Sequence, residues 1–337
     1  MKCPLCTIRE ADKKNTHYFT DKIIRSCLNL DGGNERETGF YFDLSNDSAF
    51  VEFNFQRETS IKKLEETLGR EATEEEIEQA KKIPFSVDYI FCTQCEATFT
   101  EIEDGFIDNI LPKLRGAEIS ENEELDFKEI RIIRLFFFIQ IWRTAVCEQA
   151  FKLSPEVFEK LRLIILNHAK VSDEELKEFP LSITYLETLG GEKEYTSNFV
   201  GFTSDRKPNL AILNDFVIQF YESIDDVKFF DFYDLNNAQF KKFANYNEEE
   251  FKVRIMHNVE RKAFLKEMIR KEKVKHTLSF YRNSFRELWF RMFGVNPPTL
   301  ITEQYIYFIC NQEDDVLSHT RENIIKLTQE FMMKKLQ

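Results

Sequence analysis

The spacing of apolar and polar positions predicts a chain that mixes helices and strands. Aromatic residues alternate with polar ones at 40–44 and 50–55, around a polar turn, which predicts a β-hairpin. Apolar residues recur at helical spacing over 97–114, and 127–150 is apolar at most positions, so we expect two helices there. Residues 248–293 are rich in charged helix formers and end before Pro297 and Pro298, which predicts one more long helix.

The pattern also predicts where the chain divides. Residues 116–126 are acidic and poor in apolar side chains, and we interpret them as a linker. β-forming residues cluster between 180 and 235, which predicts a small antiparallel sheet. The sequence therefore predicts an α+β protein with an N-terminal domain at 1–116. A mostly helical domain, with the small sheet inside it, is expected at 127–337.

Composition supports a folded chain and limits its surroundings. The 337 residues include 34 Phe, enough to fill a sizeable core. The most apolar stretch, 130–146, is interrupted by three arginines, so we expect a buried helix there and no membrane partner. The chain starts without the pattern of a signal peptide, and its cysteines suit a reducing compartment, so we expect a cytoplasmic protein.

Four of the seven cysteines fall into two Cys-x-x-Cys pairs. Cys3 and Cys6 form the first pair, and Cys92 and Cys95 form the second. A gap of two residues lets both thiolates of a pair turn to the same side of a tight bend. Two such pairs supply the four ligands of a tetrahedral zinc ion, each about 2.3 Å from the metal. We therefore predict a structural Zn²⁺ site, whereas a redox dithiol is the weaker alternative.

The order of these motifs resembles the zinc-knuckle branch of the HNH-type nucleases, which have a treble-clef scaffold. The resemblance covers about the first 115 residues: a Cys-x-x-Cys pair, then Thr16-His17-Tyr18-Phe19, then a second pair that opens a helix. It implies a metal-dependent nuclease with His17 as the general base and Glu101 or Glu103 as a metal ligand. This chain departs from the pattern because Thr16 stands where an acidic residue is expected. The alternative is that His17 packs beside the zinc cluster.

A narrower resemblance, to uncharacterised bacterial zinc-knuckle proteins, covers residues 1 to about 170. It rests on Cys-Pro-Leu-Cys at the start, on the second knuckle at 91–96 and on an aromatic helix that ends in Trp142-Arg143. It implies a bacterial intracellular protein with a role in phage or mobile-element defence. It supplies no catalytic residues.

The charge of the chain is unevenly distributed. The net charge is −13, yet residues 259–293 hold ten Lys or Arg against four Glu, interleaved with aromatic residues. A basic helix with aromatic side chains suits contact with phosphates and bases, so helix 260–291 is our candidate surface for nucleic acid or a partner protein. The alternative is a solvated helix whose apolar stripe packs on the sheet. The candidate nucleic-acid contacts are Arg261, Lys262, Lys266, Arg270, Lys271, Lys273 and Lys275.

Three arginines interrupt the apolar helix expected at 127–150. Long side chains can extend from a buried stem to the surface, so we expect Arg131, Arg134 and Arg143 to reach solvent. The more specific alternative is a buried pair of guanidinium groups that binds a phosphate or a carboxylate.

These observations leave three functional hypotheses. The leading one is a zinc-stabilised module that contacts another macromolecule. The second is the HNH-like nuclease with His17 as its base, and the third is a ligand-sensing or protein-interaction subunit built on the C-terminal sheet. The sequence lacks the glycine-rich phosphate loops and the serine-hydrolase and HExxH motifs that would indicate other enzyme classes.

Overall fold

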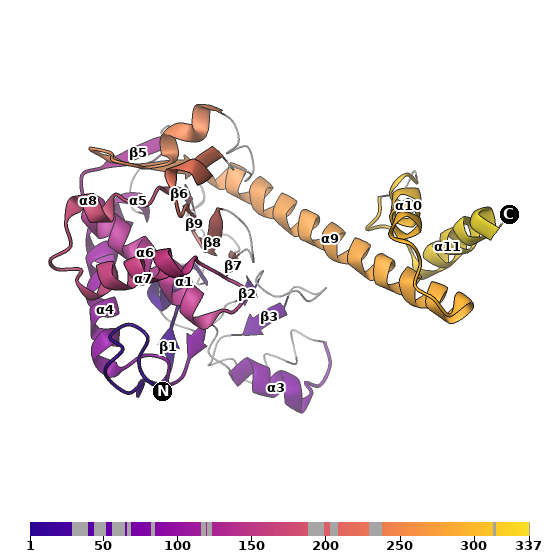
Figure 1. The fold of residues 1–337 in the computed structure, drawn as a ribbon, viewed down its shortest axis with the longest axis horizontal. Coiled ribbons are helices and arrows are strands. Elements are labelled where there is room, and N and C mark those ends of the chain that lie inside the picture. The colour runs from indigo at the N-terminus through magenta and orange to yellow at the C-terminus, as the bar shows by residue number, and fades with distance from the viewer. Residues whose placement is uncertain are drawn as a thin grey trace. The chain divides into compact units, whose positions relative to one another are not determined.

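The chain forms two compact units, shown in the ribbon of Figure 1. The computed structural model describes residues 1–28, 40–43, 52–55, 65, 69–81, 85–115, 119, 123–187, 199–202, 208–228, 238–312 and 315–336. The first unit ends at Lys262 and the second begins at Ala263. This division differs from the expected linker at 116–126. One hydrophobic core extends from Cys3 to Ile255, so the segments on both sides of that linker share it.

An eight-stranded mixed sheet lies at the centre of the first unit. Its strand order is β3-β2-β7-β8-β9-β6-β10-β5, with parallel pairing at β2–β7 and β6–β10 and antiparallel pairing elsewhere. The sheet is thus larger than the small antiparallel one expected, and the end of the predicted region, 229–235, lies outside the described residues. The strands are β2 (Phe40–Asp43), β3 (Glu52–Phe55), β5 (Glu124–Phe127), β6 (Leu181–Leu186), β7 (Phe199–Phe202), β8 (Asn209–Leu213), β9 (Phe216–Phe220) and β10 (Phe251–Met256).

Helices pack on one face of this sheet, and α6 is the innermost of them. Phe137 and Phe138 of α6 contact Phe216 and Phe220 of β9, with ring centroids 5.6 and 6.0 Å apart. Helices α4 and α7 cover the other sides of α6, which explains why a helix with apolar residues all round is buried. The helices of this unit are α1 (Asp21–Leu28), α3 (Glu74–Lys81), α4 (Thr93–Asn109), α5 (Leu111–Arg115), α6 (Ile130–Cys147), α7 (Pro155–Leu166) and α8 (Asp173–Leu176), with 3₁₀ turns η1 (Ile224–Lys228) and η2 (Ala238–Phe243).

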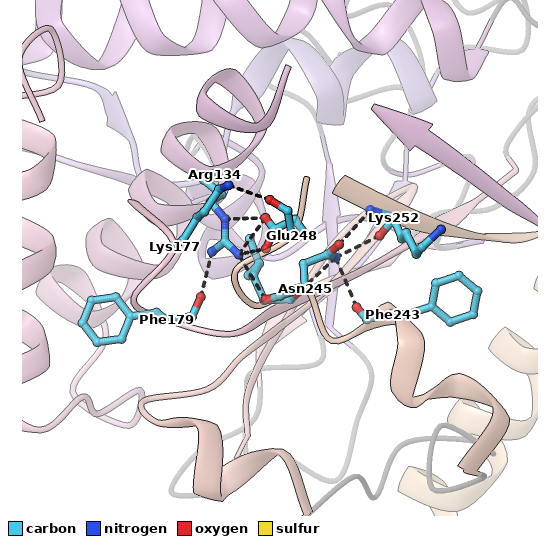
Figure 2. A network of polar contacts seen from close by, with 8 residues as sticks. Arg134, Lys177, Phe179, Phe243, Asn245, Glu248 and Lys252 are labelled. Carbon is cyan, nitrogen blue, oxygen red and sulfur yellow. Dashed lines mark hydrogen bonds and ion pairs between the residues drawn. The ribbon is translucent and has the colours of Figure 1, made fainter. Parts of the chain in front are cut away.

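A buried polar network joins α6 to the loop before β10 (Figure 2). Arg134 donates two hydrogen bonds of 2.9 Å to the carboxylate of Glu248, and others to the carbonyls of Phe179 (2.7 Å) and Asn245 (3.0 Å). The Asn245 side chain donates to the carbonyl of Lys252 and accepts from its N–H. We expected Arg134 to reach the surface, but it is buried. Glu248 and two carbonyls accept hydrogen bonds from its guanidinium inside the protein.

Several sequence-based expectations are confirmed, and two elements differ. Strands β2 and β3 pair antiparallel as the predicted hairpin requires, with its turn outside the described residues, and α4 with α5 accounts for the helix predicted at 97–114. Part of the expected linker is strand β5, which pairs with β10 at the edge of the sheet. The long helix does not begin at 248, because 251–256 alternates buried and less buried side chains as strand β10.

The second unit consists of helices with a small core of their own. Helix α9 (Asn258–Phe293) runs into this unit and is followed by α10 (Thr299–Cys310) and α11 (Arg321–Leu336). Phe285 of α9 stacks on Tyr305 of α10 with ring centroids 4.2 Å apart, and Phe331 of α11 packs against both. Within the part of the chain that the structure describes, every helix is too short or too polar to span a membrane.

Candidate metal centre

The first eleven residues fold into a tight loop that carries the first cysteine pair. The N–H of Cys3 donates to the carbonyl of Arg9 (2.9 Å), and the N–H of Thr7 donates back to the carbonyl of Cys3 (2.8 Å). Thr7 has a φ of 59°, the left-handed conformation that lets the chain reverse directly after Cys6. The loop therefore turns both thiols of the pair toward one point, as a metal knuckle requires.

The second pair sits at the start of α4. Cys92 is the N-cap residue of this helix and Cys95 lies in its first turn. The helix is capped from outside: Asp12 accepts hydrogen bonds from the N–H (2.8 Å) and the hydroxyl (3.2 Å) of Thr93. The N–H of Thr93 lowers the pKa of the Asp12 carboxyl, so the cap is a charged one. Because Asp12 follows the first knuckle, this bond also holds the two knuckles together.

The four thiols converge in a buried cluster. Their sulfur atoms all lie within 4.8 Å of one another, and Cys6 Sγ is 3.9 Å from Cys92 Sγ. Sulfurs placed tetrahedrally at about 2.3 Å from a zinc ion would be about 3.8 Å apart. A disulfide would need about 2.05 Å, and all four cysteines are free. The cluster of Cys3, Cys6, Cys92 and Cys95 thus has the ligands and the spacing to hold a metal ion.

Hydrogen bonds within and around the cluster favour the thiolate form of Cys3 and Cys6. The hydrogen bond from the thiol of Cys95 is the largest influence on Cys3 and, with nearby backbone N–H groups, lowers its pKa to about 4. The same bond raises the pKa of Cys95, the donor, and burial raises it further. Burial raises the pKa of Cys6, but the N–H groups of Arg9 and Ile8 outweigh it and lower that pKa overall. Thiolates are the form that binds metal.

A basic side chain from the helical layer reaches the first knuckle. Arg162 of α7 donates a hydrogen bond of 2.6 Å from Nη1 to the carbonyl of Leu5, between the first two cysteines. Its pKa is raised, chiefly by the carboxylate of Glu159 and also by the charge of Cys6. A tetrahedral site with four thiolates carries net negative charge when it holds a divalent ion, so this guanidinium suits its surroundings.

His17 lies close to the cluster in sequence but is turned away from α4. It forms strand β1 (Thr16–His17) with Thr16, and this pairs with β4 (Ser86–Val87). Neighbouring residues of a strand point to opposite faces. Thr16 is buried and contacts Glu96 of α4, whereas His17 Nε2 lies 3.4 Å from Asp21 Oδ1 of α1. The histidine therefore has a carboxylate partner, on the side away from Glu96.

The two acidic residues proposed as metal ligands point elsewhere. Glu101 is exposed and lies 3.3 Å from His168 Nε2, while Glu103 forms an ion pair with Arg143 and accepts a 2.8 Å hydrogen bond from Thr20. Over the described ranges, the cysteine cluster is the one group of three or more metal-ligating side chains. The structure thus does not bring His17, Glu101 and Glu103 together as one metal site.

A buried polar network behind the cluster was not foreseen from the sequence. Arg143 of α6 binds Glu103 of α4 and lies over the ring of Phe99, 5.0 Å from its centroid. Gln140, one turn earlier on α6, accepts from the N–H of Thr20 (3.1 Å) and donates to its hydroxyl (2.7 Å). The signal available in the sequence was the pair of polar residues inside an apolar helix, which indicates buried partners but not which ones.

The expected nucleic-acid contacts on α9 fall into three groups. Arg261 is fully buried and donates to the carbonyl of Leu186 (2.8 Å), so it is not a surface contact as expected. Arg270 forms an ion pair of 2.7 Å with Asp315, and Lys273 and Lys275 are exposed. The side chains of Lys262, Lys266 and Lys271 lie outside the described residues.

Comparison with known proteins adds no further constraint. No protein-family model, curated protein or solved structure matches this chain. The resemblance to HNH-type nucleases and to bacterial zinc-knuckle proteins, and the defence role that it implies, therefore stay predictions.

Proposed function

We propose that this chain is a zinc-stabilised interaction protein, in which the metal holds the fold and other surfaces contact a macromolecule. The observation that carries the proposal is the buried cluster of four cysteines with sulfurs within 4.8 Å of one another. Four protein ligands fill the coordination shell of a tetrahedral zinc ion and leave no open position for a substrate. A site of this composition supports a structural role.

The position of the cluster supports the same role. It links the first residues of the chain to the start of α4, and α4 packs against the buried helix α6. In zinc-finger peptides, binding of the metal contributes on the order of 10 kcal/mol to folding. A metal at this place would fix both the N-terminal loop and the helix that covers α6.

The test is replacement of one cluster cysteine beside a matched control. Cys92→Ser should lower the thermal unfolding temperature strongly and increase protease sensitivity of the N-terminal segment, because three thiolates bind zinc far more weakly. Cys310→Ser is the control, since Cys310 is an exposed cysteine on α10 outside the cluster. Equal stability of the two variants would contradict the structural role.

A second candidate is the nuclease, which the pairing of His17 with Asp21 favours. A carboxylate 3.4 Å from Nε2 can hold a histidine ring in one orientation, as a general base requires. If His17 is a general base, the protein should cleave DNA or RNA with Mg²⁺ or Mn²⁺, and His17→Ala should abolish cleavage while the protein stays folded. His168→Ala is a matched control. Cleavage that survives in His17→Ala, or a wild-type protein without cleavage, would exclude this candidate.

A further inference from the structure

The second unit carries an open apolar groove between α9 and α11. The groove encloses about 650 Å³, and Tyr305 of α10 contributes to its lining. Every side chain that lines it is uncharged. The largest exposed contributors are Phe280, Leu288, Met292, Ile325 and Met333.

These side chains are not needed for the core of the unit. That core uses Tyr281, Phe285, Tyr305 and Phe331, which are all buried. Phe280 and Met333, at the two sides of the groove, are 62% and 64% exposed. Single exposed apolar residues are common, but several that line one groove mark a surface that another molecule covers. Methionine side chains adapt to the shape of such a partner.

The chemistry of the groove selects the class of occupant. Nucleic acid would need cations in the groove to contact phosphates, and the lining has none. The fitting occupant is an apolar helical surface, which binds in grooves between helices. The groove face of α9 and α11 is itself such a surface.

The charges beside the groove suit a second copy of the same face. On α9, Glu287 and Arg291 directly precede Leu288 and Met292, and on α11 Lys326 directly follows Ile325, one turn after Glu322. Glu287, Arg291, Glu322 and Lys326 are exposed, and Glu287 and Arg291 form an ion pair with each other within α9, which a partner copy would exchange for pairs between copies. Each helix thus carries both signs beside the apolar positions. In a two-fold pair the face meets itself, so an acidic position on one copy can meet a basic position on the other.

The size of the face is adequate for such a pair. Helix α11 has 16 residues. It is therefore about 24 Å long, and two helices of about 10 Å diameter side by side present on the order of 500 Å². Two copies would bury about 1,000 Å², which reaches the lower limit of specific interfaces.

We propose that the groove between α9 and α11 is the contact surface of a symmetric homodimer. This inference rests on the proposed function: that function is contact with a macromolecule, and the inference identifies the macromolecule that the second unit contacts as another copy of this chain. In the dimer, Phe280 and Met333 of one copy pack into the groove of the other.

The test is the oligomeric state of the full-length protein with its metal, measured by analytical ultracentrifugation over a wide range of concentration. Wild type should show a monomer–dimer equilibrium. The double variant Phe280→Asp/Met333→Asp should raise the dissociation constant of the dimer about 100-fold or more, since it places charges in an apolar contact. Phe290→Asp/Leu300→Asp is the matched control: both residues are exposed in the same unit but do not line the groove.

Three outcomes overturn the inference. In the first, the wild-type chain stays monomeric at every concentration, even if another molecule binds the groove. In the second, the groove variant leaves the dimer intact. In the third, the control variant disrupts the dimer as much as the groove variant does. Circular dichroism of both variants checks that helix content is unchanged. Zinc analysis of the same samples separates the claims, because a dimer without zinc rejects only the structural metal, and a zinc-bound monomer rejects only the dimer.

Discussion

Arg143 connects the innermost helix α6 to α4, the helix that carries the second cysteine pair. The residue is 1% exposed, and its guanidinium lies over Phe99 and pairs with Glu103. We expected this side chain to reach solvent, which is wrong because it forms an ion pair with a carboxylate on α4 inside the protein. A long charged side chain in an apolar helix is compatible with exposure to solvent and with a buried ion pair. Here the ion pair forms, and its partner Glu103 lies 40 residues away in the sequence.

Removing one member of this pair should destabilise the protein strongly. Arg143→Met leaves Glu103 without its counter-charge in a largely buried site, and we expect the free energy of unfolding to fall by about 3 kcal/mol or more. The double variant Arg143→Met/Glu103→Met should recover part of the loss, because no charge is left unpaired. Urea unfolding measures both. A loss below about 1 kcal/mol in the single variant would show that the pair is effectively solvated.

Glu76 gives a prediction about pH. Arg70 holds both of its carboxylate oxygens (2.6 and 2.8 Å), and with the N–H of Thr73 it lowers the pKa of Glu76 from 4.5 to about 2. The folded carboxyl binds protons less readily than the unfolded one, so its contribution to stability is present above pH 4.5 and is lost as pH falls toward 2. NMR titration of Glu76 should show the low pKa, and Arg70→Ala should raise it. A pKa near 4.5 in the wild-type protein would refute the pairing.

At the scale of elements, long amphipathic helices were predictable and edge strands were not. The apolar face of α4 appears directly in the spacing of Phe99, Ile102 and Phe106, which are all buried. We predicted a linker at strand β5 because its residues Glu124 and Asp126 are polar. As an edge strand, however, β5 pairs with one neighbour only, β10. Strand β10 was assigned to the following helix because it has only six residues and His257 alone separates it from α9. Pairing across the sheet, which no local pattern contains, decided both cases.

Helix α9 carries the prediction of nucleic-acid binding. Lys273 and Lys275 are exposed members of the basic set. If they contact phosphates, Lys273→Ala/Lys275→Ala should weaken binding and reduce the slope of log K against log salt by about 1.4 to 1.8. Fluorescence anisotropy with labelled single- and double-stranded oligonucleotides measures this, with Lys113→Ala/Lys170→Ala as a charge-matched control. Binding that is absent, or equally weakened in the control, would remove nucleic acid from the partners of this helix.

At the scale of the whole molecule, the sequence predicted the cluster better than the architecture around it. Two short motifs were sufficient to predict the four thiols, because the spacing within each pair turns both to one side of a bend, whereas the bond between Asp12 and Thr93 that helps to join the pairs was not predicted. The domain division was not predictable, because α6 is covered by α4, which carries the second cysteine pair, as well as by the sheet. The α+β class follows from the pattern, whereas the order of the eight strands depends on contacts between residues more than 100 positions apart.

The metal content of the purified protein tests the central claim most directly. Inductively coupled plasma mass spectrometry on protein prepared without added metal should find close to one zinc ion per chain, as one four-thiolate site requires. Native mass spectrometry should show the ion lost on acidification, because protonated thiols do not bind it. Native protein that contains no zinc, and whose unfolding temperature is unchanged by a strong chelator, would contradict the account.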